Sequence, residues 1–265
     1  MRTVVKFLFF FILFNIVVAK NISNNKINVV GSTTLISSIV KEIGKDKVSV
    51  IVIIPSGICP GHFDLPVGII KHLHDSKIFF YHGWEKWLDK ILSNMQTETL
   101  KMIKLKTSNS WMVPEINKFA AREIKDYFCE IDVENIMYYE KNLANYIKKV
   151  DNISKKIKKD FAKYSGTKVI SSVMQKEFLE WIGLEVVKTY GRIEDLNVKD
   201  VKELVDVAKK YNVKIVIDNL QSGSNSAKNI AKDINAKHIV LSNFPEDSYF
   251  DTLEKNIKKL KEVLR

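Results

Sequence analysis

Cysteine is nearly absent from this chain. Only Cys59 and Cys129 occur among its 265 residues, so an oxidising compartment would allow one disulfide at most. Cys129 directly follows a predicted helical stretch (116–128), where a small buried hydrophobic side chain fits well. We therefore predict no disulfide and expect Cys59 to be a free thiol.

Nucleotide-binding motifs and low-complexity segments are also missing. The segment "GSTT" at 31–34 follows a predicted strand. It lacks the remaining glycines and the lysine of a phosphate-binding loop, and no dinucleotide-binding motif occurs. These absences give no support to nucleotide-dependent chemistry.

The long apolar run in the sequence lies at the N-terminus. Thirteen residues, 7–19, follow the charged segment 1–6 and precede the polar "KNISNNK". This run is shorter than the roughly 20 residues of a membrane-spanning helix. We predict a secretory signal peptide at 1–19, with an uncleaved N-terminal anchor as the alternative. No cysteine directly follows the run, which excludes a bacterial-type lipid attachment site. We expect an exported protein in the periplasm or on the outer face of the cell membrane.

Positive charge is in excess, with a formal net charge of +11. The lysines are scattered along predicted helices and interleaved with Asp and Glu, a pattern typical of solvated helix faces. We therefore predict no nucleic-acid partner. Attraction to an anionic membrane surface is the weaker alternative.

Short β-branched runs alternate with helical segments from residue 27 onward. This rhythm is typical of βαβ units on a parallel sheet. It restarts after residue 164, with helices expected at 174–182, 198–211 and 224–235. The sequence thus predicts an α/β fold with two Rossmann-like lobes, at 27–131 and 164–265.

A long helix is predicted between the lobes. Residues 132–163 contain no proline or glycine, and their apolar residues keep a helical spacing. Asp132 is the expected N-cap. At 1.5 Å per residue the helix would be roughly 45 Å long, so we expect it to join the lobes as a rigid strut.

Ligands of open α/β sheets bind beyond the carboxyl ends of the strands. One such end carries the loop "PSGICPGHFDLP" at 55–66, in which Cys59 stands three residues before His62. The intervening Pro-Gly permits a turn that lets the two side chains converge. His72, His74 and His238 are expected to face solvent.

Three motifs carry a resemblance to a known family. They are "HFDLP" (62–66), "WMVPEINKFAAREI" (111–124) and "IDVENIMYYEKNLANYIKKVDNISKKI" (131–157). With them, nearly all of 27–265 resembles the zinc- and manganese-type solute-binding proteins of ABC transporters. The resemblance implies two lobes joined by one rigid helix, a divalent transition metal as transported cargo, and an ABC permease in the membrane as partner.

The metal ligands of that family are only partly retained. The resemblance implies three histidines and one carboxylate, and the first histidine matches His62. The other positions fall on Asn109, on Ser172 or Val173, and on Ser242. Amide and hydroxyl groups are poor replacements for the imidazole and carboxylate ligands of Zn²⁺. Cys59 is an additional candidate ligand.

Three functions can be compared. In the first, His62 and Cys59 bind a zinc-like metal, with help from His82, Asp64 or Asp218. In the second, the same fold binds a small organic ligand or a metal chelate, because amides, an arginine and aromatic faces stand in the expected cleft. In the third, Cys59 and His62 form a catalytic pair, but no third group is present to orient them. We predict that the chain is not an enzyme.

The first function is our prediction and the second its alternative. We expect a monomeric binding protein that takes up a metal ion or small solute between its lobes. The residues expected to line the cleft are Cys59, His62, His82, Asn109, Trp111, Ser172, Arg192, Asn219, Gln221 and Ser242.

Overall fold

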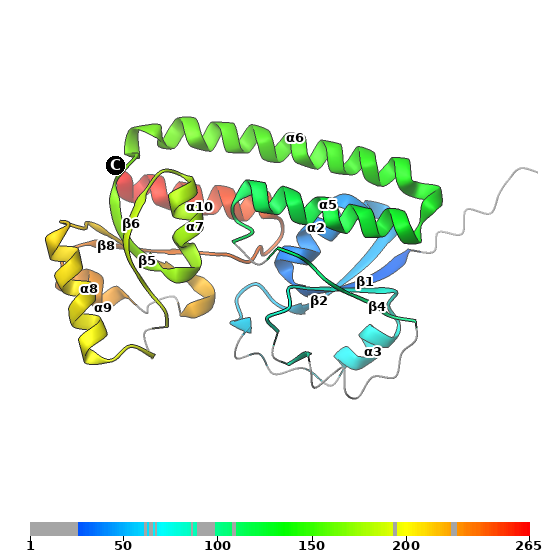
Figure 1. The fold of residues 1–265 in the computed structure, drawn as a ribbon, viewed down its shortest axis with the longest axis horizontal. Coiled ribbons are helices and arrows are strands. Elements are labelled where there is room, and N and C mark those ends of the chain that lie inside the picture. Colours follow the sequence, from blue (N-terminus) through cyan, green and yellow to red (C-terminus); the bar gives the residue numbers. More distant parts are fainter. Residues whose placement is uncertain are drawn as a thin grey trace, which may run out of the picture.

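Two parallel sheets of four strands each organise the chain (Figure 1). The computed structural model describes residues 26–60, 63, 66, 68–85, 87–88, 99–107, 110–192, 195–223 and 227–265. Within these ranges no helix is long and apolar enough to cross a membrane, and Cys59 and Cys129 are free thiols. The predicted signal segment 1–19 lies outside the described residues.

The first sheet has the strand order β2-β1-β3-β4. Its β-branched runs are covered by helices, as expected for a parallel sheet. In β1 six of the seven residues are buried. The elements of this lobe are β1 (Ile27–Thr33), α2 (Thr34–Gly44), β2 (Val48–Ile54), α3 (Ile69–His74), β3 (Ile78–Tyr81), β4 (Lys101–Lys104) and α5 (Pro114–Ile131).

The second sheet repeats this arrangement with the order β6-β5-β7-β8. All of its strand pairs are parallel, so the predicted α/β fold with two lobes is confirmed. Its elements are β5 (Lys168–Ser172), α7 (Lys176–Trp181), β6 (Glu185–Tyr190), α8 (Val198–Lys210), β7 (Ile215–Asn219), α9 (Lys228–Asp233), β8 (Lys237–Leu241) and α10 (Tyr249–Leu264).

One long helix, α6 (Ile136–Phe161), links the lobes (Figure 1). Its 26 residues correspond to about 39 Å. Short 3₁₀ turns at Val133–Asn135 and Ala162–Tyr164 flank it within the predicted span. Buried side chains along one face include Tyr139, Tyr146 and Val150, which match the predicted apolar spacing.

The predicted N-cap role of Asp132 is wrong. Its carboxylate accepts hydrogen bonds from the side chains of Asn135, at 2.9 Å, and Tyr139, at 2.6 Å. A 3₁₀ turn separates Asp132 from the first residue of α6, so its oxygens reach side chains in place of the helix amides. These hydrogen bonds of Asp132 stabilise the turn between α5 and α6.

The C-terminal helix α10 also packs on the first lobe. The Tyr249 backbone N–H donates to Ser38 Oγ of α2 at 2.9 Å, and the Tyr249 hydroxyl donates to the Met112 carbonyl at 3.2 Å. The Phe250 ring meets Tyr146 of α6 edge-on, with 5.3 Å between centroids. One hydrophobic core therefore joins α6, α10 and both lobes. The segment limits 27–131, 132–163 and 164–265 stay a prediction.

We predict that Val150→Ala destabilises the protein by about 2 kcal/mol. Val150 is fully buried in the shared core, so truncation removes two methyl groups and leaves a cavity. Val133→Ala is the matched control, because Val133 is 66 % exposed. Urea titrations followed by circular dichroism measure both changes. Equal losses for the two variants would contradict the central position of α6 in the core.

Candidate functional site between the lobes

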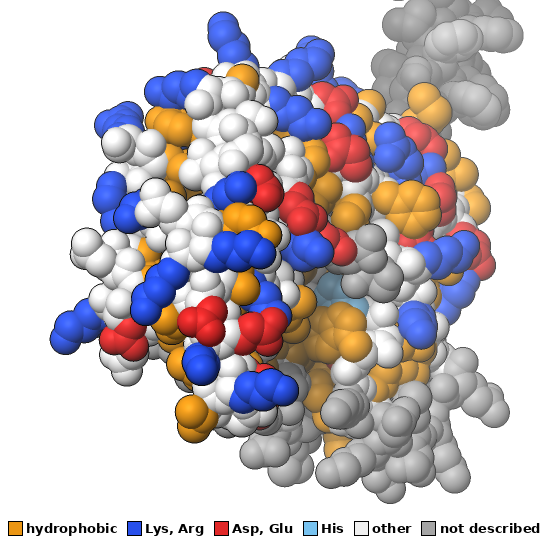
Figure 2. All heavy atoms as spheres, turned by 60° about the vertical axis from the view of Figure 1, so that its left-hand side comes forward, with side chains coloured by type: hydrophobic (Ala, Val, Ile, Leu, Met, Phe, Trp, Pro, Cys, Tyr) orange, Lys and Arg blue, Asp and Glu red, His pale blue; other side chains and the backbone are white. Residues whose placement is uncertain are grey.

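Loops that follow the strand ends of the two sheets contact each other. These loops come from opposite halves of the chain and are joined by direct hydrogen bonds. Figure 2 shows a hollow in the surface where a histidine side chain lies among hydrophobic side chains. Three contacts between the lobes at this place are Gln221 Nε2 to the Ser56 carbonyl oxygen at 2.6 Å, Arg192 Nη2 to Cys59 Sγ, and the Ser110 backbone N–H to Glu177 Oε2 at 2.8 Å.

His82 lies buried just beyond β3, on the first lobe's side. Only 6 % of the residue is exposed, and its Nε2 lies 2.9 Å from Thr33 Oγ1. The ring stacks on Trp84 with a centroid distance of 4.9 Å and meets Trp111 edge-on at 4.7 Å. These contacts hold the imidazole in one orientation. The predicted site residues His82 and Trp111 are thus brought together.

The buried carboxylate of Glu85 fixes the loop around His82. It accepts hydrogen bonds from the backbone N–H groups of His82, at 2.8 Å, and Gly83, at 2.6 Å. Gly83 has a φ of 97°, a conformation that favours glycine. Burial lowers the pKa of His82 to about 4, although Glu85 acts in the opposite direction. The imidazole is therefore neutral near pH 7 and keeps a nitrogen lone pair.

A group of neutral side chains lies on the second lobe's side of the site, beside Arg192 and Glu177. Gln175 Nε2 donates to Asn219 Oδ1 at 3.0 Å and to Asn243 Oδ1 at 2.9 Å. Gln221 Nε2 also donates to Ser242 Oγ at 3.0 Å, and Gln221 Oε1 accepts from the Asn243 N–H at 3.1 Å. We call these five residues the amide cluster. Its polar atoms are largely used in bonds to one another.

Asp218 precedes Asn219 of the amide cluster in the sequence and is only 1 % exposed. Its carboxylate accepts from the Tyr190 hydroxyl at 2.5 Å and from the Ala227 N–H at 3.0 Å, and lies 2.6 Å from His238 Nε2. The expectation that His238 faces solvent is wrong, because its side chain is only 15 % exposed. These bonds join the last residue of β6 and the beginning of β8 to Asp218 near the end of β7.

The remaining predicted site residues are placed differently. Ser172 is buried, and its Oγ accepts from the Met174 N–H at 3.4 Å. His62, Asp64 and Asn109 lie outside the described residues. Among the residues that the structure does describe, no three His, Cys, Asp or Glu side chains form a group able to hold a metal.

Glu85 and Gln175 are site residues that sequence reasoning missed. Glu85 stands three residues after His82, a spacing at which a carboxylate can accept the backbone N–H groups of a loop. Gln175 stands three residues after Ser172, at the start of a helix. Both signals are local and frequent, so neither indicates a site without the fold.

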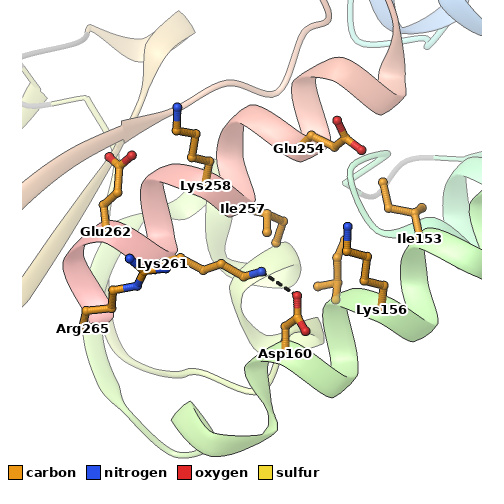
Figure 3. Close-up of a pocket in the computed structure, with 10 residues that line it drawn as sticks. Ile153, Lys156, Asp160, Glu254, Ile257, Lys258, Lys261, Glu262 and Arg265 are labelled. Carbon is orange, nitrogen blue, oxygen red and sulfur yellow. Dashed lines mark hydrogen bonds and ion pairs between the residues drawn. The ribbon is translucent and has the colours of Figure 1, made fainter.

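A surface groove of about 460 Å³ lies elsewhere, between α6 and α10 (Figure 3). Lys261 of α10 reaches Asp160 of α6 across it at 2.5 Å. Basic and acidic side chains alternate along its walls, and no histidine or cysteine lines it. It is remote from the strand ends, so we do not place the site there.

Two parallel α/β lobes, one connecting helix and polar loops that meet between the lobes define the class of two-lobed solute-binding proteins. The family model described as the periplasmic component A of zinc-uptake complexes matches residues 29–263. The chain belongs to this family, which confirms the resemblance seen in the sequence. The family is one of transport proteins and not an enzyme class.

Proteins similar to this chain are named for metal transport or metal binding. The manganese ABC transporter substrate-binding lipoprotein ScaA of Streptococcus gordonii is 25 % identical over 91 % of this chain and 90 % of its own length. A crystal structure of ZnuA has a TM-score of 0.81 at 19 % identity and covers 91 % of this chain and all of its own. A Mn-bound periplasmic metal-binding protein of Candidatus Liberibacter asiaticus has a TM-score of 0.79 at 18 % identity, with the same coverage.

We predict a pH dependence of stability that arises from His82. Its pKa of 6.5 in the unfolded chain falls to about 4 in the folded protein, so between these values the unfolded chain binds more protons. Stability from this group is complete above pH 6.5 and is lost as the pH falls towards 4. The loss amounts to roughly 3 kcal/mol.

Unfolding free energies of the metal-free wild type and of His82→Gln, measured from pH 7 to pH 4, test this prediction. The wild type should lose stability more steeply, because glutamine does not titrate. Parallel curves for the two proteins would refute the assignment.

Proposed function

We propose that this protein captures a zinc-like divalent transition metal ion between its lobes and delivers it to an ABC permease. The family match over residues 29–263 carries this proposal. ScaA, named above, is a manganese ABC transporter substrate-binding lipoprotein. A zinc-bound AdcA of Streptococcus pneumoniae shares the fold with a TM-score of 0.73 at 20 % identity, covering 91 % of this chain and 58 % of its own.

Cys59 and His62 are the proposed metal ligands. Both lie in the loop after β2, which meets the second lobe through Ser56 and Cys59. A thiolate and an imidazole suit zinc better than manganese, which prefers oxygen ligands. Neutral His82 is near the same lobe's strand ends and is a further candidate, although Thr33 already occupies its Nε2.

The amide cluster favours a metal over an organic cargo. Asn243 is hydrogen-bonded to both Gln175 and Gln221. Gln221 also donates a hydrogen bond to the Ser56 carbonyl of the first lobe. Few free donors therefore remain there for a polar solute. We propose that this cluster shapes and closes the second wall of the site, while the first lobe supplies the ligands.

The proposed location is extracytoplasmic. Relatives are named lipoproteins, whereas no cysteine directly follows the apolar run 7–19 of this chain. We propose that segment 1–19 is a signal peptide that directs export or, as the alternative, an uncleaved anchor that holds the protein at the membrane in place of a lipid. The protein is proposed to work as a monomer beside its permease, without nucleic acid.

We predict that the double variant Cys59→Ala, His62→Ala loses its metal. Elemental analysis of the purified protein and calorimetric titration with Zn²⁺ measure the loss. Cys129→Ala is the matched control, because Cys129 lies on α5 and packs against the hydrophobic core. Unchanged metal content and affinity in the double variant would contradict the proposed ligands.

We also predict that Gln221→Ala speeds metal release about fivefold. The substitution removes one neutral hydrogen bond between the lobes, worth about 1 kcal/mol. Ser242→Ala is the control, because Ser242 contacts Gln221 within one lobe and leaves the bond to Ser56 in place. Stopped-flow transfer of Zn²⁺ to a chelator measures both rates. Equal rates in the two variants would show that the bond to Ser56 does not hold the site closed.

A further inference from the structure

An exposed apolar patch lies where α5 ends and α6 begins. Val133 and Met137 are 66 and 81 % exposed, and Ile131 and Ile136 are 36 and 37 % exposed. Single exposed hydrophobic residues are common, but neighbouring ones mark a contact surface. We call these four residues the apolar corner. The bonds of Asp132 to Asn135 and Tyr139 hold this corner in shape.

The chain enters the fold beside the apolar corner. Tyr138, next to Met137, donates a hydrogen bond to the Asp46 carboxylate. This bond lowers the pKa of Asp46, and the nearby charges of Lys47 and Lys26 act in the same direction. Lys26 is the first residue that the structure describes. In Figure 1 the start of β1 and the turn between α5 and α6 lie at the same end of the molecule.

The distance from this entry point to the apolar run is limited by the chain. Residues 20–26 can span about 25 Å at most when fully extended. If the run 7–19 is held in a membrane, the entry point and the apolar corner are kept close to the bilayer surface. No other described part of the fold is tied so directly to that segment.

Charged side chains of both signs border the corner. Lys47 Nζ lies 5.8 Å from the centre of the Tyr138 ring, and Lys26 is close enough to act on Asp46. Glu134, between Val133 and Ile136, is exposed as well, so charge does not favour an anionic bilayer over a neutral one. Exposed apolar side chains flanked by charged ones are the composition of surfaces that rest in the interfacial layer of a bilayer.

We propose that the apolar corner lies against the surface of a lipid bilayer, beside the membrane-held N-terminal segment. This inference rests on the proposed extracytoplasmic location and on retention of that segment. The first lobe would then face the membrane, and α6 would carry the second lobe away from it. The bilayer would set the orientation in which the site between the lobes meets a permease.

Full-length protein in phosphatidylcholine vesicles tests this proposal. An environment-sensitive fluorophore is attached at Met137→Cys in a background where Cys59 and Cys129 are replaced by serine. The control position is Val198→Cys, because Val198 is 88 % exposed on the second lobe. We expect a blue-shifted emission and quenching by brominated lipids at position 137, and neither at position 198. Mass spectrometry verifies that the N-terminal segment is present.

Equal emission and quenching at the two positions would overturn the proposal. So would a label at position 137 that is shielded before vesicles are added, with the protein eluting as a dimer, because the corner would then bind a second copy. Shielding only in the presence of the permease would also overturn it.

A charged variant separates this inference from the metal-binding function. Met137→Glu, made with the native cysteines, should lose contact with the bilayer, seen as increased digestion of the segment around residue 137 by added protease. Its affinity for Zn²⁺ should stay unchanged, because the corner is remote from the loops between the lobes. Loss of lipid contact with intact Zn²⁺ binding supports the proposal, and unchanged protection contradicts it.

Discussion

Burial of one face of α6 is the interaction on which the rest of the structure depends. Neither lobe encloses its own helices completely, because α5, α6 and α10 share one core with both sheets. The hydroxyl of Tyr146 adds a directional bond to Asn117 of α5 at 2.6 Å. A helix held over its whole length cannot bend freely at its centre. The loops between the lobes are therefore presented at a nearly fixed separation.

The two walls of the site are built from different chemistry on this common frame. The first wall has a neutral imidazole fixed between two tryptophan rings, and a loop that carries a thiol. The second wall contains the amide cluster, whose bonds are mostly internal, although Gln175 Oε1 is buried without a partner among the described residues. Buried polar networks are rigid where their members are satisfied. The imidazole and thiol of the first wall can therefore exchange hydrogen-bond partners for a ligand, whereas the side chains of the second wall mainly keep their positions.

The sequence predicted the fold because its signals are periodic and extend over many residues. Alternating β-branched and amphipathic segments located both sheets, and the spacing in 132–163 located α6. Errors arose where a distant partner decides the outcome. His238 turns inward because Asp218, 20 residues earlier, lies on the neighbouring strand. Gln175 was missed for the same reason, since its partners Asn219 and Asn243 are far away in the sequence. Glu85 was missed because its signal, a carboxylate that accepts nearby backbone N–H groups, is local and frequent.

The neutrality of the amide cluster limits how protons can influence the cargo. Amides and hydroxyls do not titrate in the physiological range, so the amide cluster offers the same hydrogen-bonding surface in acidic and alkaline surroundings. Competition between protons and a cation bound by the proposed ligands then falls on the thiol and imidazole groups of the first lobe. Acidification would weaken the grip of that lobe while leaving the shape of the amide cluster unaltered.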